Sequence, residues 1–186
     1  MYDIEKIANA IKYFKQHKVK HLGKTKLMKL LFFVDKYHLK EYSKPVFYDK
    51  YFKLPFGPVP SLTLNIIDSL NEIENTDLDT YSKAFSKHIQ LKETTFNSNV
   101  KRLEFEIIKP FDNDYFSKSE LEIMDIVIKQ FKNMNANEIS EYSHTLPEYQ
   151  NTPLNEIIDY SQMSDDNSEF IEFIESLNNE LDEVLS

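Results

Sequence analysis

The stretch from Leu27 to Val34, LMKLLFFV, limits most strongly what this chain can fold into, because it holds one lysine among seven apolar residues. It lies within Thr25–Tyr42, which has the length and pattern of a helix. Apolar side chains then almost surround the helix axis, and a helix of that kind is normally buried on most sides. The sequence therefore predicts a central buried helix over 25–42.

Amphipathic helices are expected around it. Asp3 can cap the first, Pro60 suits the first turn of the second, and Ser117–Glu120 and Ser119–Glu122 each fit a capping box at the start of the third. The expected ranges are 3–17, 61–74, 117–132, 135–144 and 153–161.

Alternating apolar residues on either side of FNSNV predict one small antiparallel β-hairpin over about 88–109. Residues 43–60 are aromatic, interrupted by prolines and too irregular for a helix. The fold class expected is mainly α (α+β), a compact helical domain around helix 25–42.

The last segment, 163–186, is expected to be an acidic amphipathic C-terminal helix. Phe170, Ile174, Leu177 and Leu181 share one face of it, and acidic residues occupy the other. We expect a helical domain over 1–162 followed by this helix. Both a helix packed on the domain and a semi-detached helix that binds a partner remain open.

Charge is distributed unevenly along the chain, whose formal net charge is −9. Residues 1–53 sum to +8, residues 54–132 to −4 and residues 133–186 to −13. Cysteine is absent, and no run of about 18 apolar residues occurs. We expect a cytoplasmic protein that has no membrane partner. The excess of lysine over the single arginine, Arg102, is interpreted as a compositional bias.

The residue content gives little support to catalysis or metal binding. Two glycines in 186 residues exclude the phosphate-binding loops and the nucleophile elbow, which need several. Among five histidines, only His17 and His21 are spaced as H-x-x-x-H, and no glutamate accompanies them. We therefore expect no enzyme activity, no catalytic residues, no metal and no cofactor.

Seven lysines between residues 12 and 29 form the most basic part of the chain: Lys12, Lys15, Lys18, Lys20, Lys24, Lys26 and Lys29. They favour either a solvated lysine face or contacts with DNA phosphates. A nucleic-acid-binding regulator that uses the Lys-rich region 12–29 is therefore kept as the alternative function.

Three motifs in order carry a resemblance to a known family. They are Thr25–His38 (TKLMKLLFFVDKYH), Phe56–Pro60 (FGPVP) and Ser143-His144. This set resembles the Panacea, or SocA-like, antitoxin domain of phages and mobile elements over about residues 5–160. The matching residues are Lys26, Lys29, Asp35, Gly57, Pro58, Ser143 and His144. Ser43 stands where the family often has glycine, and Tyr149 where a tryptophan is expected.

The resemblance implies an antitoxin that binds and neutralises a toxin protein encoded nearby. Some members deliver the toxin to a Clp-type protease as proteolytic adaptors. The candidate partner-binding residues are aromatic or apolar: Phe47, Tyr48, Tyr51, Phe52, Phe56, Val59, Phe170, Ile174, Leu177 and Leu181.

The segment LPFGPVP (54–60) is expected to form a rigid corner. Gly57 can adopt backbone angles that other residues avoid, and the three prolines restrict its neighbours. We expect the corner to be structural first and a partner contact second. We also expect His144 and Asp35 to pair across the core.

Overall fold

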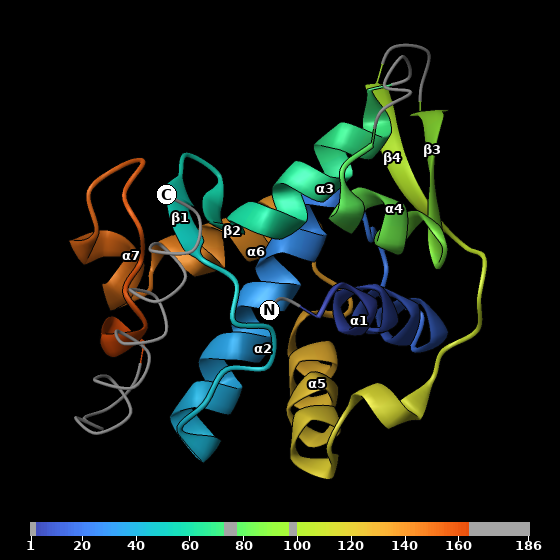
Figure 1. Ribbon diagram of the computed structural model, residues 1–186. Coiled ribbons are helices and arrows are strands. Elements are labelled where there is room, and N and C mark those ends of the chain that lie inside the picture. Colours follow the sequence, from blue (N-terminus) through green and yellow to red (C-terminus); the bar gives the residue numbers. More distant parts are fainter. Residues whose placement is uncertain (1–2, 73–77, 97–99, 164–186) are drawn as a thin grey trace.

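The computed structural model describes residues 3–72, 78–96 and 100–163 of the protein. In that part of the chain helices predominate, with two short antiparallel hairpins, so the mainly α (α+β) class is confirmed (Figure 1). The helices are α1 (Ile4–Gln16), α2 (Lys24–Tyr42), α3 (Ser61–Asn71), α4 (Thr80–Ser86), α5 (Lys118–Phe131), α6 (Ala136–His144) and α7 (Pro147–Asn151), with 3-10 turns η1 (Asn113–Tyr115) and η2 (Tyr160–Gln162). The strands are β1 (Tyr51–Leu54), β2 (Gly57–Pro60), β3 (Ile89–Phe96) and β4 (Val100–Ile107).

The central helix is α2, as predicted. It contacts α3, α5, α6 and β2, and the side chains from Lys26 to Asp35 are all buried. Phe33 stacks on Phe131 of α5 with ring centroids 4.3 Å apart, and Phe32 meets Tyr51 of β1 edge-on at 5.2 Å. An aromatic core thus joins α2 to elements before and after the middle of the chain.

Helix starts follow the predicted caps with one exception. Asp3 accepts the backbone N–H of Lys6, and Ser117 with Glu120 forms the capping box of α5. The second predicted box, Ser119–Glu122, is wrong. The Ser119 hydroxyl bonds instead to Ser117 and to the ring of His38, because the helix has already begun.

Helix α3 is capped from a distance. Its N-cap is Pro60, which has no side-chain acceptor. The buried carboxylate of Asp49 accepts the backbone N–H groups of Leu62 and Thr63, both at 3.1 Å, and the Thr63 hydroxyl at 3.0 Å. Helix α3 ends at Asn71. The predicted end, residue 74, lies outside the described residues.

The irregular stretch 43–60 contains a hairpin that the sequence did not indicate. Strands β1 and β2 pair antiparallel from Tyr51 opposite Pro60 to Leu54 opposite Gly57. On the other side of β1, the backbone of Asn155 donates to Lys53 at 2.8 Å. Ile158 N–H likewise donates to Tyr51 O at 2.8 Å. The predicted helix over 153–161 is therefore wrong, since these backbone groups bond to β1 instead of forming helical turns.

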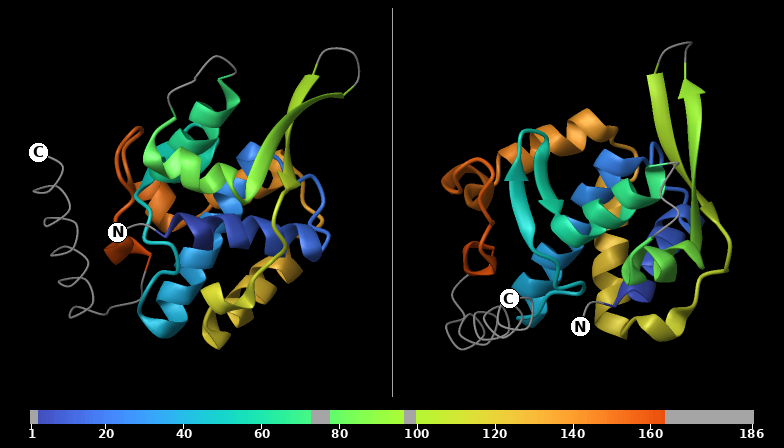
Figure 2. Two further views of the ribbon diagram at one scale, coloured as in Figure 1. Left: turned by 45° about the vertical axis from the view of Figure 1, so that its right-hand side comes forward. Right: turned by 45° about the horizontal axis from the view of Figure 1, so that its top comes forward.

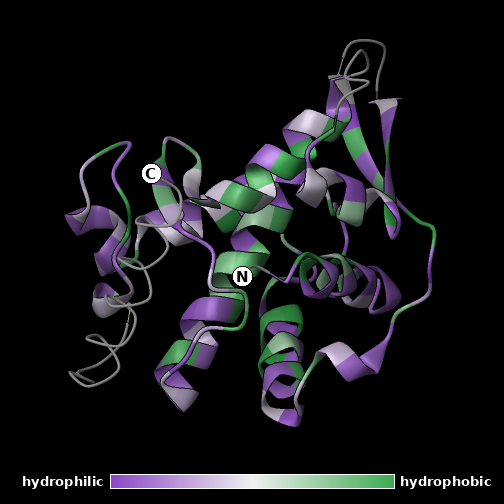
Figure 3. Cartoon of the chain, viewed as in Figure 1, coloured by the Kyte–Doolittle hydropathy of each residue, from purple (hydrophilic) through white to green (hydrophobic). Residues whose placement is uncertain are grey.

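The predicted second hairpin is confirmed as β3–β4, whose register runs from Ile89 opposite Ile107 to Phe96 opposite Val100. Both views in Figure 2 show it projecting from the helical body. Helix α4, which is not among the helices expected from the sequence, precedes it. Hydrophobic and hydrophilic bands alternate along the helices in Figure 3, as expected for amphipathic helices.

The predicted acidic helix over 163–186 lies, after Met163, outside the described residues, and so do Phe170, Ile174, Leu177 and Leu181. The division into 1–162 and 163–186 stays a prediction. In the described part of the chain, no helix is both long and apolar enough to cross a bilayer.

Candidate functional site

Residues of all three motifs meet in one buried cluster at the β1–β2 turn. The ammonium group of Lys29 in α2 donates to the carbonyl of Pro58 at 2.9 Å, and the hydroxyl of Ser143 in α6 donates to Ser140 O at 2.7 Å. Gly57 lies between them at φ +97°. A Cβ built on Gly57 would lie 2.7 Å from Lys29 Cε and still closer to the Ser143 Oγ. Gly57 is thus required both for the backbone angle and for the approach of α2 and α6.

The Lys29 side chain is almost fully buried, and burial lowers its pKa to about 7. Ser143 is also fully buried. A lysine beside a serine is an arrangement that can support nucleophilic catalysis. Both side chains are buried in the structure, where the cluster holds the β1–β2 hairpin against α2 and α6.

Asp35 ties the loop before β1 to the centre of α2. Its Oδ1 accepts the backbone N–H groups of Val46 and Phe47 at 2.7 and 2.8 Å. Its Oδ2 accepts the hydroxyl groups of Tyr51 and Tyr160 at 2.8 and 3.2 Å. Complete burial raises the pKa of Asp35 to about 7, and the bonds from Phe47, Tyr51 and Val46 act in the opposite direction. The motif aspartate therefore accepts hydrogen bonds from four donors.

Lys26 joins three chain segments through backbone carbonyls. Its buried ammonium group donates to Lys20 O at 2.7 Å, to Lys132 O at 3.1 Å and to Met134 O at 2.5 Å. Its ammonium group thus ties the turn before α2 to the segment that follows α5. Ser43, at the end of that helix, has φ +56°, a left-handed backbone angle that glycine adopts most easily.

The predicted pairing of His144 with Asp35 is wrong. The His144 ring stacks on Tyr149 with centroids 4.7 Å apart, and its Nδ1 lies 3.9 Å from a carboxylate oxygen of Glu141. Asp35 has its oxygens filled by the four donors named above, so it has no place for an imidazole. Tyr149, found where tryptophan was expected, donates its hydroxyl to Leu54 O at 2.8 Å.

A family model described as "Antitoxin SocA-like, Panacea domain" matches residues 27–150. The chain belongs to this family. The match runs from α2 to α7 and contains the Lys29–Gly57–Ser143 cluster and Asp35. No curated protein and no solved structure matches the chain.

The predicted contact residues of the Panacea domain differ in how far they are buried. Phe47, Tyr51 and Val59 were candidate partner contacts, but all three are buried in the hydrophobic core, so they are not on the surface that a partner would meet. Tyr48 is exposed, and Phe56, in the β1–β2 turn, has 71% of its surface exposed. Phe52 lies between these extremes.

Sequence reasoning missed two exposed apolar residues in the segment that pairs with β1. Leu154 is 54% exposed and Ile157 49%, and Ile157 forms a β-bridge with Phe52 of β1. We call Phe56, Leu154 and Ile157 the hairpin patch. The segment that carries Leu154 and Ile157 resembled a helix, so only the pairing with β1 could place it here.

The lysine-rich region does not form one charged face of the Panacea domain. Lys12, Lys26 and Lys29 are buried, so neither the solvated-face nor the DNA-contact expectation holds for them. Lys24 forms an ion pair with Asp68. Lys15, Lys18 and Lys20 are exposed, so the DNA alternative keeps only part of the lysine set on which it rested.

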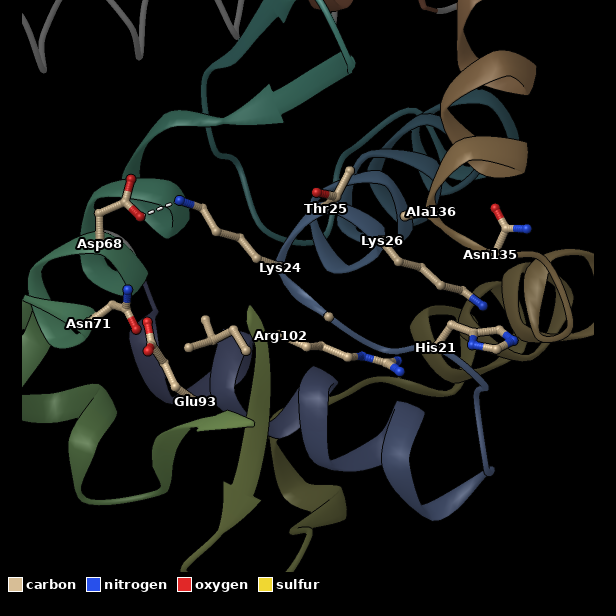
Figure 4. A pocket seen from close by; sticks show the side chains of 12 residues that line it. His21, Lys24, Thr25, Lys26, Asp68, Asn71, Glu93, Arg102, Asn135 and Ala136 are labelled. Carbon is tan, nitrogen blue, oxygen red and sulfur yellow. Dashed lines mark hydrogen bonds and ion pairs between the residues drawn. The ribbon is translucent and has the colours of Figure 1, made fainter. Parts of the chain in front are cut away.

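A cavity of about 530 Å³ opens where α2 begins (Figure 4). Four chain segments line it: the turn before α2 with its first residues, α3, the β3–β4 hairpin and the start of α6. Figure 4 shows Arg102 and His21 toward one end and Asp68 and Glu93 toward the other. The two carboxylates thus lie at one end, where Lys24 is paired with Asp68, and Arg102 lies nearer the other. In the described residues, no three His, Cys, Asp or Glu side chains are placed to hold a metal ion.

Proposed function

We propose that this protein is an antitoxin that binds a toxin protein and neutralises it without catalysing a reaction. The observation that carries this proposal is the match of residues 27–150 to the SocA-like antitoxin family. A stable complex of this kind buries about 1,600 Å² in total, so neutralisation would act by occluding the surface of the toxin.

The burial of the motif residues supports a division of labour. Lys29, Asp35, Gly57 and Ser143 lie inside the domain, where a partner cannot touch them. The shared motifs would then specify a scaffold, and each antitoxin would recognise its own toxin through the surface. The hairpin patch is a candidate contact because Phe56 lies in the β1–β2 turn, and Leu154 and Ile157 lie in the segment whose backbone bonds to β1. Exposed apolar side chains on backbone that is already held cost little conformational entropy on binding.

The acidic segment 164–186 is a second candidate contact, since it holds eight acidic residues and no basic ones. A basic toxin would be steered toward it. Deleting 164–186 is expected to weaken toxin binding and to leave the free energy of unfolding of the domain unchanged. Equal neutralisation by the truncated and full chains would remove this segment from the proposal.

A growth assay in a bacterial host tests the function directly. The open reading frame next to this gene is induced alone, and then together with this protein. Rescue of growth with co-purification of the two proteins is expected. Rescue without a stable complex would favour delivery of the toxin to a Clp-type protease. If the neighbouring product is harmless and does not bind, the antitoxin proposal fails.

A further inference from the structure

We propose that the cavity at the start of α2 is a carboxylate-binding pocket in which Arg102 receives an acidic side chain of the protein partner. This inference rests on the proposed function, because the carboxylate belongs to the toxin. It adds a specific polar anchor to the apolar hairpin patch.

Arg102 is the only arginine in the chain, and it lines the cavity from β4. Its side chain is half-buried, and its guanidinium forms no hydrogen bond or ion pair with residues that the structure describes. A guanidinium presents a planar set of donors that matches the two oxygens of a carboxylate. Partial burial would also protect such a pair from screening by salt.

The other cations of the cavity are already engaged. Lys24 is paired with Asp68, and Lys26 donates to three backbone carbonyls. Burial lowers the pKa of Lys26 to about 8, Glu138 opposes that shift, and the positive charge of Arg102 adds to it. The two cations thus repel each other across this end of the cavity, and a bound anion would relieve the repulsion.

The backbone at the start of α2 adds a smaller attraction for an anion to that of Arg102. Gly23, the N-cap of the 19-residue helix α2, offers its first amides no side-chain acceptor, and it lines the same cavity. Free amides at a helix start favour negative charge.

The acidic end of the cavity decides which anion fits. Asp68 and Glu93 lie opposite the Arg102 end (Figure 4). Lys24 is already paired with Asp68, so this end offers no spare cation, and a nucleic-acid strand with a charge on every phosphate would gain little there. An isolated acidic side chain, flanked in the partner by neutral or basic residues, matches both ends.

Nuclear magnetic resonance can test the pocket without the toxin, because the chain provides three isolated signals. Arg102 gives the only arginine Nε–H resonance, and Gly23 and Gly57 are the only glycines. The probes are sodium acetate, a blocked glutamate peptide with a basic neighbour, and inorganic phosphate, each titrated into the full chain. We expect saturable shifts of Arg102 and Gly23 with both carboxylates, while Gly57, buried in the motif cluster, stays fixed. Shifts with phosphate alone, or with none of the probes, would overturn the proposal.

Binding of the toxin then separates the pocket from the proposed function. We expect Arg102→Gln to weaken binding at least tenfold and Arg102→Lys to weaken it less, because lysine keeps the charge and loses the fork. Lys118→Gln is the matched control, since Lys118 is 92% exposed on α5, and it should change affinity less than twofold. Wild-type affinity in Arg102→Gln would refute the pocket and leave the antitoxin function standing. Absence of toxin binding by the wild type would refute the function, and the titrations would still report on the pocket.

Discussion

The two hairpins of this domain are held in different ways. Hairpin β1–β2 is fixed by buried polar groups from distant elements: Lys29 bonds to Pro58, and Gly57 fits against Ser143. Hairpin β3–β4 buries apolar side chains such as Phe105 on one face and leaves charged side chains on the other.

The difference indicates which interactions stabilise each hairpin. Alternation along β3–β4 follows from having one buried face, so one buried side chain should carry much of its stability. In β1–β2 the backbone at Gly57 packs directly against the side chains of Lys29 and Ser143, so small changes of shape or charge should be costly. The experiments below test this contrast.

The largest effect is expected for Phe105→Ala in β4. Phe105 is 1% exposed, and removing a buried phenylalanine costs about 4 kcal/mol through lost burial and a cavity. Urea unfolding of the variant measures this loss. The partner substitution Leu91→Ala, at the half-buried position opposite Phe105, should cost less. Equal losses would mean that burial is not what holds this hairpin.

Gly57→Ala should cost about 3 kcal/mol, from the unfavourable positive φ and from overpacking against Lys29 and Ser143. The control is the other glycine. A Cβ on Gly23 would meet its nearest atom, Leu103 O, at 3.6 Å and needs no unusual φ, so Gly23→Ala should cost less than about 1 kcal/mol. Thermal unfolding compares the two, and similar losses would contradict the close packing of β1–β2.

The next effect is a dependence on pH in β1–β2. The pKa of Lys29 falls from 10.5 in the unfolded chain to about 7 in the fold, because the side chain is buried. Between these values the unfolded chain binds more protons, so the free energy of unfolding rises with pH. We expect the Lys29 contribution to grow by about 2 kcal/mol from about pH 7 to pH 9.

Lys29→Met removes this contribution and should flatten the rise, whereas Lys118→Met, at an exposed position, should preserve it. Urea unfolding at several pH values measures the slopes. An unchanged slope in Lys29→Met would show that the ammonium group carries no such penalty.

The smallest effect on stability is expected for Phe56→Ala, since Phe56 is 71% exposed in the β1–β2 turn. The free energy of unfolding should change by less than about 0.5 kcal/mol. Affinity for the toxin should nevertheless fall about tenfold, as expected for an exposed aromatic anchor. Ile126→Ala, which truncates a 50% exposed side chain on α5, is the control and should leave affinity unchanged. Full affinity in Phe56→Ala would remove the hairpin patch from the interface.

The sequence by itself determined the features that depend on neighbours within a few residues. The all-round apolar pattern of α2, the Asp3 cap of α1, the Ser117–Glu120 box of α5 and the alternation in β3–β4 were all predicted. Each is set by a local period or by hydrogen bonds within one turn, so the chain around it is sufficient. The family motifs were also evident in the sequence, but the contacts that their residues make were not.

Only the tertiary structure decided the rest. In the sequence, Lys26 and Lys29 resembled surface charges. In the structure they are buried and donate to backbone carbonyls up to 108 residues away along the chain. The residues from Asn155 to Ile158 had a helical pattern, but their backbone groups found partners on β1. The proposed role of Arg102 depends on a cavity that four chain segments line together. A buried charge or an unpaired backbone group is satisfied by whichever group lies nearby in space, and distance along the chain does not reveal that group.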